Sequence, residues 1–468
     1  MIGPATATHT STYAIIGNGI AGITAAEILR AENAQAVITV IADDPYPAYY
    51  RPALKDYLAG RVNEDKLWAR PTNFYQKHSI RFLRERVIGI QVEQHMIEFQ
   101  SGQRLAYQHL LLAQGAQASR LSCPGVNLQG VLTLRTVADY QRVESCLSQV
   151  KRVVVVGSGT LALETIETLR HRGYQVVHLL RKQILWSEIL DATASDLVLQ
   201  QEQRDGVEVR QGEEIAEISG QHGQVSGVVT TNGKQIPCEL VLIAIGIDPI
   251  IDFVTRSGIA CRRGIMVDAS MRTIAPDIYA AGDVLETTDY LTGRSRVIGQ
   301  WYPAIQQARA AAYAMLGILD TTRSFLASTF YNASFLYGLN FASVGLTTLR
   351  QENRGYQELI ADPQPRTYQK AILKGGIPVG MLALGNRKGV LAYKRAIDYQ
   401  VNLSPILDML FAPTFQLDAW LDRQGVPPIL SGVTRASAPV PRYDGSSAAA
   451  KRLFLAPQLV LPVRADER

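Results

Sequence analysis

Short apolar runs that end at a glycine and lead into helix-forming residues occur twice in this chain. The first run, residues 13–16, ends at Gly17, and the second, residues 153–156, ends at Gly157. An apolar run of this length, followed by a glycine and then by good helix formers, predicts a strand, a tight turn and a helix. Two copies of one supersecondary unit are a far stronger signal than either copy alone. The pattern therefore predicts an α/β fold with two similar units.

The glycines of the first unit have the spacing G-x-G-x-x-G, at residues 17–22. Gly17 permits the tight turn, Gly19 removes a Cβ so that the backbone can approach a pyrophosphate, and Gly22 lets the helix pack closely on the sheet. The phosphates would then lie at the N-terminus of the helix, where free N–H groups and the helix dipole favour anions. Alone, the spacing is a weak signal, because a glycine-rich turn can be purely structural.

An acidic pair follows the next apolar run, residues 36–41, which we expect to be a parallel strand. Asp43 lies 21 residues after Gly22 (43 − 22), which suits a carboxylate that bonds a ribose hydroxyl. Asp44 is the close second choice. The strand–helix–strand order and the acid together favour dinucleotide binding over a purely structural turn.

The second unit repeats this order with one difference in its glycine turn. The turn is residues 157–162, and Ala162 stands in place of the third glycine. We expect a helix from about Ala162 to Arg172 and a parallel strand over residues 175–180.

The rest of the chain alternates short apolar runs with turn signals. Residues 270–283 predict a strand that ends at Gly282 and Asp283, ahead of a helix. Residues 413–468 differ, because residues 431–450 are rich in Ser, Ala, Pro and Gly and predict a linker. Further strands are expected within residues 80–99, 110–116, 206–245, 326–345, 356–361 and 368–384, and further helices at about 303–316 and 388–398.

Composition and charge narrow the class of protein. A length of 468 residues suggests about three domains, and 47% hydrophobic with 19% charged residues is ordinary for a globular protein. A net charge of +5 is too small to indicate nucleic-acid binding, although it would suit an acidic protein partner. Residues 1–12 are polar, and no run approaches the roughly 18 apolar residues of a membrane-spanning helix. We therefore expect no signal peptide and no transmembrane segment.

The cysteines are spread along the chain, and none forms a CxxC or CxxxxC pair. Isolated thiols of this kind suit a reducing compartment, so we expect a cytoplasmic protein. No cluster of Cys and His could hold zinc or an iron–sulfur centre, so we expect no metal site. The cysteines are Cys123, Cys146, Cys238 and Cys261.

Seven segments of the chain carry recognisable motifs or flanking patterns, in this order: residues 17–22, 45–60, 110–116, 153–164, 275–283, 299–312 and 367–386. Together they resemble the motifs of the FAD-dependent pyridine nucleotide oxidoreductases. Within that family the chain is most similar to the NAD(P)H:rubredoxin reductases and to the flavoprotein part of the NAD(P)H nitrite reductases. The likeness covers about residues 12–412.

The resemblance implies an α/β fold with two Rossmann-like dinucleotide-binding domains, the NAD(P)H domain being inserted in the FAD domain, and a small α+β C-terminal domain. The implied FAD-binding domain is discontinuous, at residues 12–116 and 246–320, and the NAD(P)H-binding domain is residues 117–245. Residues 325–412 would form the C-terminal reductase domain, and residues 413–468 an extension with a linker and an apolar tail.

The resemblance also assigns roles to single residues. Arg51 matches a basic position beside the flavin, and Glu164 matches a glutamate near the nicotinamide amide, so both are candidate catalytic residues. Glu164 could equally be a helix-surface acid. The implied contacts to FAD are Gly17, Gly19, Ile20, Ala21, Asp43, Arg51, Val87, Ala113, Gly115, Gly282, Asp283 and Trp301. The implied contacts to the nicotinamide dinucleotide are Gly157, Gly159, Thr160, Leu161 and Gly246.

One departure from the family concerns the choice between NADH and NADPH. The family usually has an acid after the second strand of this unit, where it bonds the ribose 2′-hydroxyl of NADH. This chain has Leu180 there, followed by Arg181 and Lys182. Loss of a carboxylate and gain of two cations suit a 2′-phosphate, so we expect NADPH to be slightly favoured. The alternative is a degenerate site that binds no nicotinamide dinucleotide.

A second departure concerns thiol chemistry. Disulfide reductases on this fold carry a cysteine pair after the first unit or a CxxC, but residues 43–60 contain no cysteine. No histidine follows His222, so the acid–base partner of the dithiol enzymes is absent too. We therefore expect electrons to pass from NAD(P)H through FAD to an acidic one-electron carrier, such as rubredoxin, ferredoxin or a nitrite-reductase partner.

Two other functions stay open. The chain could be a cofactor-holding flavoprotein subunit of a larger redox complex with a degenerate nicotinamide site, which Leu180 and the extra tail suggest. A quinone-reducing dehydrogenase at a membrane surface ranks last, because Pro457 and Pro462 break any anchor helix. The apolar tail, residues 453–463, would either dock on a partner subunit or pack on the body of its own chain.

Overall fold

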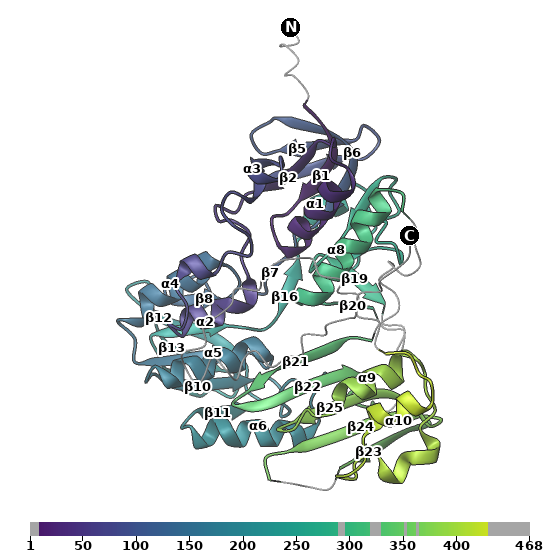
Figure 1. Ribbon diagram of the computed structural model, residues 1–468. Coiled ribbons are helices and arrows are strands. Elements are labelled where there is room, and N and C mark those ends of the chain that lie inside the picture. Colours follow the sequence, from purple (N-terminus) through teal and green to yellow (C-terminus); the bar gives the residue numbers. More distant parts are fainter. Residues whose placement is uncertain (1–8, 289–294, 319–328, 351–352, 362–364, 429–468) are drawn as a thin grey trace.

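The computed structural model describes residues 9–288, 295–318, 329–350, 353–361 and 365–428 (Figure 1). The first sheet has the strand order β3-β2-β1-β6-β5-β4, with β18 paired to β6. Its strands are β1 (His9–Ile16), β2 (Ile38–Ala42), β3 (Arg81–Arg84), β4 (Val87–Gln91), β5 (Met96–Phe99), β6 (Arg104–Leu112) and β18 (Ile278–Ala280).

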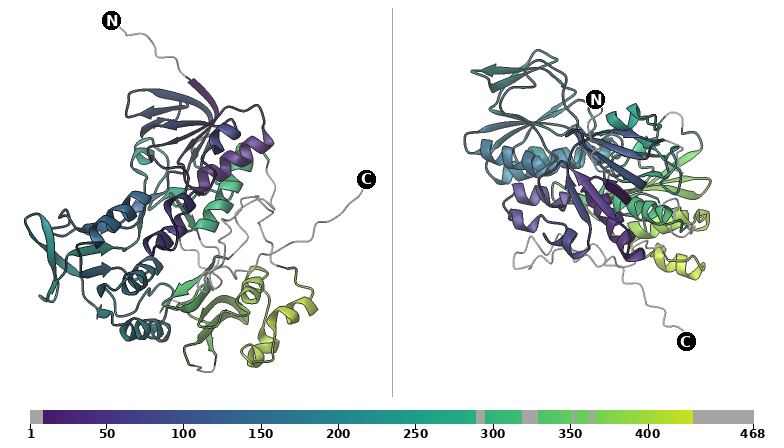
Figure 2. Two further views of the ribbon diagram at one scale, coloured as in Figure 1. Left: turned by 60° about the vertical axis from the view of Figure 1, so that its left-hand side comes forward. Right: turned by 90° about the horizontal axis from the view of Figure 1, so that it is seen from above.

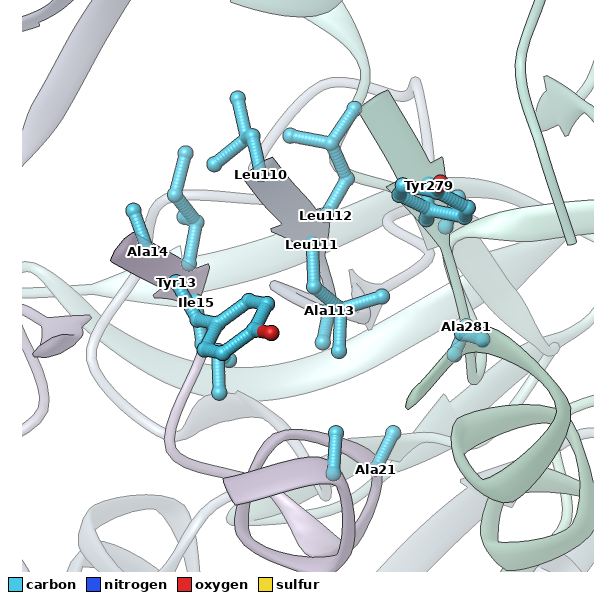
Figure 3. Close-up of a cluster of buried hydrophobic side chains, with 14 of the residues drawn as sticks. Tyr13, Ala14, Ile15, Ala21, Leu110, Leu111, Leu112, Ala113, Tyr279 and Ala281 are labelled. Atoms are coloured by element: carbon cyan, nitrogen blue, oxygen red, sulfur yellow. The ribbon is translucent and has the colours of Figure 1, made fainter. Parts of the chain in front are cut away.

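The centre of this sheet is parallel and buried on both faces. Strand β1 pairs in parallel with β2 and β6, and β18 pairs in parallel with β6. Ile15, Leu111 and Ala280 are fully buried, and Figure 3 shows side chains of all three strands in one cluster above Ala21. Helices α1 (Ile20–Glu32) and α8 (Trp301–Met315) lie side by side against the sheet (Figures 1 and 2). Continuous apolar runs form these strands because neither face meets water.

Short elements surround the first sheet and lead to the second. The chain passes between the two sheets through the antiparallel pair β7 (Ala116–Ala118) and β16 (Ile247–Pro249). The other short elements are η1 (Arg51–Ala53), α2 (Leu54–Leu58), η2 (Glu64–Lys66), α3 (Phe74–Lys77), α7 (Asp252–Arg256), β17 (Ile265–Met266), β19 (Leu285–Thr288) and β20 (Ser295–Val297).

The second sheet is parallel throughout, with the order β11-β10-β9-β15-β8. A small antiparallel sheet, β12-β13-β14, adjoins it. The strands are β8 (Val131–Thr133), β9 (Arg152–Val156), β10 (Gln175–Leu180), β11 (Glu208–Gln211), β12 (Ile215–Gln221), β13 (Gln224–Thr230), β14 (Gln235–Pro237) and β15 (Leu240–Ile243), and the helices are α4 (Val137–Leu147), α5 (Thr160–His171) and α6 (Ala192–Arg204).

Helix α2 packs on the core of this second unit, although in the sequence it lies between strands β2 and β3 of the first unit. Leu54 and Leu58 are buried in one cluster with Val143 of α4 and Ile166 of α5. This crossing carries Lys55 to the second unit.

The third sheet is antiparallel, in the order β21-β22-β25-β24-β23. Leu417 and Leu421 of α10 are buried in the core that this sheet forms with α9, so the packed structure continues past residue 412. The elements are β21 (Tyr331–Leu336), β22 (Leu339–Gly345), β23 (Tyr356–Ile360), β24 (Tyr368–Lys374), β25 (Ile377–Leu384), α9 (Val390–Asp398), η5 (Ser404–Met409) and α10 (Leu417–Arg423).

Side-chain contacts join the third unit to the second, beside which it lies in Figure 1. Lys370 is 1% exposed, and its ammonium lies 2.5 Å from the Asp191 carboxylate, which caps α6. The Tyr368 hydroxyl donates to the same carboxylate at 2.7 Å. The rings of Phe341 and Trp186 are 5.4 Å apart. The third unit therefore braces the loop between β10 and α6.

The predicted fold class is confirmed: two α/β units, each with a parallel centre to its sheet, are followed by a smaller α+β unit. The domain boundaries at 12–116, 246–320, 117–245 and 325–412 stay predictions. Both glycine turns and the predicted helices are present, α8 beginning at Trp301 rather than at Pro303. The linker and the apolar tail lie outside the described residues. Within the described residues, no helix is long and apolar enough to cross a membrane.

Candidate functional site

One continuous cavity of about 1400 Å³ extends from the glycine turn after β1 to the glycine turn after β9. It therefore joins the first unit to the second. Every residue that the sequence assigned to a site lines it: Gly17, Gly19, Ile20, Ala21, Asp43, Arg51, Val87, Ala113, Gly115, Gly157, Gly159, Thr160, Leu161, Glu164, Arg181, Lys182, Gly246, Gly282, Asp283 and Trp301.

The first glycine turn has a shape that only glycine permits at two positions. Gly17 has φ +117°, and a Cβ there would lie 2.1 Å from the Ala113 carbonyl oxygen. A Cβ on Gly22 would lie 2.0 Å from the Gly17 carbonyl oxygen. A Cβ on Gly19 would meet no described atom within 4 Å, so this position faces the open cavity. Gly19 caps α1 without a side-chain hydrogen bond, which leaves backbone N–H groups for an anion.

The two acids after β2 are in different environments. The Tyr46 N–H donates to Asp44 Oδ1 at 3.1 Å, and burial raises the pKa of the Asp44 carboxyl despite this bond. Asp43 is exposed and lines the cavity. An accessible carboxylate can accept a hydrogen bond from a ribose hydroxyl, and of the two acids only Asp43 is exposed.

An arginine that the sequence did not single out holds Asp283. Arg135 Nη2 donates to Asp283 Oδ2, and Arg135 Nε donates to the Ala116 carbonyl at 3.1 Å. Arg51 in turn donates to the Arg135 carbonyl oxygen. Burial and the nearby Arg51 lower the pKa of Arg135. These contacts tie Asp283, which follows β18, to the second unit.

Arg135 is placed by the N-terminus of α4. Thr136 and Asp139 form a capping box, in which Asp139 Oδ2 accepts from the Thr136 N–H at 2.8 Å. The same oxygen accepts from the Arg135 N–H at 3.1 Å. The T-x-x-D sequence could have predicted this helix start. It could not have predicted the contact with Asp283, which is 148 residues away.

Trp301 lies in the first turn of α8 and lines the cavity, as Asp283 does. Its ring makes an edge contact with Tyr50, with the centroids 4.8 Å apart. The next side chain, Tyr302, is 66% exposed. Gln300 caps the helix without a side-chain hydrogen bond, and it lines the cavity together with Trp301.

Glu164 lies where the three units meet. Lys55 of α2 donates to Glu164 Oε1 at 2.5 Å, and Ser334 of β21 donates to the same oxygen at 3.1 Å. The side chains of Lys55 and Glu164 are only 22% and 18% exposed. Glu164 is therefore not a helix-surface acid, and neither bonding partner could be inferred from the sequence pattern.

The second glycine turn closely repeats the first. Gly157 has φ +142°, and a Cβ there would lie 2.2 Å from the Ala244 carbonyl oxygen. A Cβ on Gly159 would meet no described atom within 4 Å, and Gly159 caps α5 with no side-chain hydrogen bond. This turn therefore offers a second anion-binding position in the same cavity.

Arg181 and Lys182 both line the cavity beyond this turn, and an acid lies near each. Arg181 Nε is 3.8 Å from Glu214 Oε1, and Lys182 Nζ is 3.9 Å from Glu188 Oε1. Lys182 also donates to Ser187 Oγ at 3.0 Å. A 2′-phosphate would thus compete with two carboxylates for these cations.

The described residues hold no group of His, Cys, Asp and Glu that could bind a metal ion. The four cysteines lie within the described part of the chain, and none is in a disulfide. None of them lines the cavity.

Two glycine turns of the dinucleotide-binding kind share one cavity, which the Arg135–Asp283 and Lys55–Glu164 ion pairs also line. This arrangement is that of an oxidoreductase with two cofactors. The chain belongs to the pyridine nucleotide-disulphide oxidoreductase family, whose model matches residues 11–308. The predicted family and the predicted oxidoreductase class are thereby confirmed. Proteins of this kind use FAD and a nicotinamide dinucleotide, and the two glycine turns fit two such cofactors.

Individual relatives agree with this assignment. The chain is 35% identical over 306 residues to the ferredoxin–NAD(+) reductase component of the biphenyl dioxygenase system of Paraburkholderia xenovorans, which covers 65% of this chain and 74% of the relative. It is 28% identical to a rubredoxin–NAD(+) reductase of Pseudomonas putida, in an alignment that covers 65% of this chain and 79% of the relative. It is also similar to the crystal structure of the ferredoxin reductase for the CYP199A2 system of Rhodopseudomonas palustris, with a TM-score of 0.79, 25% identity and coverage of 89% and 100%.

Proposed function

We propose that this protein is an FAD-dependent NAD(P)H oxidoreductase that delivers electrons to an acidic one-electron carrier protein of the ferredoxin or rubredoxin type. The observation that carries the proposal is the single cavity, which both glycine turns share and which no cysteine lines. A disulfide reductase would need a thiol in that cavity. The named relatives support the choice of carrier.

The first turn and its neighbours would hold FAD. Backbone N–H groups at Gly19 and Ile20 would bind the pyrophosphate, and Asp43 the adenosine ribose. Asp283, held by Arg135, would bond the polyol chain, and Trp301 would contact the ring system. Bound FAD supplies the acceptance of a hydride and the release of single electrons.

The second turn would hold the nicotinamide dinucleotide, with Glu164 beside its amide group. Lys55 and Ser334 restrict the Glu164 carboxylate to one orientation. A fixed carboxylate can accept a hydrogen bond from the amide and so hold the nicotinamide ring against the flavin end of the cavity. Arg51, whose guanidinium lies 5.1 Å from the Tyr49 ring centroid, adds positive charge there.

The carrier would approach beside Trp301. Tyr302 is exposed next to it, and Arg296 stacks on the Phe330 ring at 5.4 Å. Aromatic and arginine side chains are enriched in protein interfaces, and the basic charge suits an acidic partner. The free thiols favour the cytoplasm as the location.

NADPH remains slightly favoured over NADH in this proposal, because Arg181 and Lys182 line the cavity beyond the second turn. The nearby Glu214 and Glu188 would reduce the preference, since each already pairs with one of the cations. We therefore expect a protein that accepts both dinucleotides.

Carrier reduction tests the proposal. Purified holoprotein would be mixed with NADPH and either a [2Fe–2S] ferredoxin or a rubredoxin, and separately with a small disulfide substrate. We expect the carrier to be reduced and the disulfide to be left intact. Turnover of the disulfide without reduction of either carrier would contradict the proposal.

A further inference from the structure

A fully buried histidine–glutamate pair lies behind the second glycine turn. His178 of β10 and Glu202 of α6 are both 0% exposed, and His178 Nδ1 lies 2.7 Å from Glu202 Oε2. The other ring nitrogen, His178 Nε2, lies 2.6 Å from the Gly157 carbonyl oxygen. Gly157 is the first glycine of the turn, so the pair connects α6 to the dinucleotide-binding backbone.

The hydrogen-bond roles at Gly157 follow from its chemistry. A carbonyl oxygen can only accept, so His178 Nε2 must carry the proton and donate it. Glu202 at the opposite ring nitrogen fixes that arrangement, whether the shared proton sits on the imidazole or on the carboxyl group.

The first unit has no such pair at the same position. In the second unit, His178 pairs with Val155, two residues before Gly157. In the first unit, Val40 holds the matching place, because it pairs with Ile15, two residues before Gly17. Val40 is fully buried and apolar. The strand arrangement itself therefore does not require a polar residue here.

The two turns also differ at their last residue. A Cβ on Gly22 would lie 2.0 Å from the Gly17 carbonyl oxygen, yet Ala162 carries a Cβ at the matching position. The backbone hydrogen bond that leads into the turn is also longer in the second unit. The Gly157 N–H is 3.4 Å from the Leu179 carbonyl, whereas the Gly17 N–H is 2.8 Å from the Ile41 carbonyl.

The bond to Gly157 orients the next peptide group. In a planar trans peptide the C=O of one residue and the N–H of the next point in opposite directions. With the Gly157 carbonyl held inward by His178, the Ser158 N–H points outward, and Ser158 lines the cavity. That N–H is one of the donors a dinucleotide pyrophosphate would use.

Stability alone does not explain the pair. Glu202 Oε1 is buried and has no hydrogen-bond partner among the described residues. Burying a carboxyl group with half of its acceptors unused is costly, and apolar replacements of similar volume are often neutral or stabilising. A functional role at the adjacent turn accounts for its presence.

We propose that His178 and Glu202 are positioning residues for the nicotinamide dinucleotide, which compensate for Ala162 by holding the Gly157 peptide in its binding orientation. The inference rests on the proposed function only in that the second turn binds a nicotinamide dinucleotide.

Two amide substitutions that differ by one methylene separate the two bonds of the imidazole. Asparagine can replace only the Nδ1 contact, so His178→Asn keeps a partner for Glu202 and loses the bond to Gly157. Glutamine reaches the Nε2 position, so His178→Gln keeps the bond to Gly157. Calorimetric titration of the oxidised holoprotein with NAD⁺ and with NADP⁺ gives the dissociation constants, and FAD content and thermal unfolding are measured beside them.

We expect the dissociation constant to rise about tenfold in His178→Asn, the effect of one well-placed hydrogen bond, and about threefold or less in His178→Gln. Adding Ala162→Gly to His178→Asn lets the second turn adopt the shape of the first and should restore most of the affinity. The KM for the nicotinamide dinucleotide should follow these changes, with kcat and FAD content unchanged.

Other results would overturn the inference. A lower unfolding temperature in His178→Asn with an unchanged dissociation constant would show that the pair is purely structural. If Ala162→Gly does not restore the affinity that His178→Asn loses, the pair does not compensate for Ala162. If His178→Asn does not fold, the double variant His178→Val, Glu202→Leu removes both polar partners and should show the same tenfold loss; unchanged affinity would refute us. Dinucleotide binding without carrier reduction would refute the proposed function alone, whereas no binding by the unsubstituted protein would refute both.

Discussion

The ion pair between Lys55 and Glu164 should act as one unit in hydride transfer. A separation of 2.5 Å corresponds to roughly 7 kcal/mol of attraction at an effective dielectric constant of about 20. Desolvation and partial exposure of both side chains offset most of this. The net value of such a charge-assisted hydrogen bond is about 2 kcal/mol.

A double-mutant cycle measures that value. We expect Lys55→Met and Glu164→Gln each to slow flavin reduction about 30-fold, which is about 2 kcal/mol in the activation free energy. The double variant should be little slower than either single variant, because the second substitution removes a partner that is already idle. Stopped-flow measurement of the reduction rate, at saturating NADPH, gives the four rate constants.

A second ion pair in the same segment is the matched control. Arg61 lies 2.6 Å from Asp56, but its side chain is 43% exposed and solvent screens the pair. Arg61→Met and Asp56→Asn should each change the reduction rate less than about twofold. Two results would refute the reasoning. In one, the rate loss of the Lys55–Glu164 double variant equals the product of the two single-variant losses. In the other, the single variants lose no more rate than the Arg61 and Asp56 controls.

Other predictions follow from the same contacts. Arg135→Met should lower FAD retention after gel filtration, because it frees the carboxylate that Arg135 holds, and full retention would count against that role. Arg181→Ala should lower kcat/KM for NADPH about tenfold more than for NADH, and Glu214→Gln should change the ratio the other way. Asp191→Asn should lower the unfolding temperature at pH 7, and this loss should shrink in acid. Desolvation raises the Asp191 pKa, yet hydrogen bonds from Lys370 and other donors outweigh it and lower the pKa overall. The stabilisation is therefore present above the unfolded pKa of about 4 and is lost as pH falls through the folded pKa, so an equal loss at pH 7 and in acid would contradict this.

The sequence predicted the parts of the site that local geometry determines. The glycine turns at residues 17–22 and 157–162 could be recognised because a tight turn and a close approach each demand glycine at a fixed spacing. Asp43 could be recognised as a candidate because it follows a buried strand directly. These features depend on short stretches of chain, which a periodic pattern describes well.

The missed features all depend on tertiary contacts. Arg135 reaches Asp283 across 148 residues, and Ser334 reaches Glu164 from the third unit across 170. His178 is one buried residue in an apolar strand, and its meaning appears only when its register is compared with Val40. Sequence periodicity carries no information about such pairs, because any surface of a packed unit could meet any other.

The central claim is that a nicotinamide dinucleotide reduces a flavin in this cavity without the help of a thiol. An anaerobic titration of the purified holoprotein tests it most directly, with the flavin absorbance followed at about 450 nm while NADH and NADPH are added in separate runs. We predict bleaching by both, at a lower concentration of NADPH, and the same result after the cysteines have been alkylated. No bleaching by either dinucleotide while FAD stays bound would contradict the account and favour a cofactor-holding subunit of a larger complex.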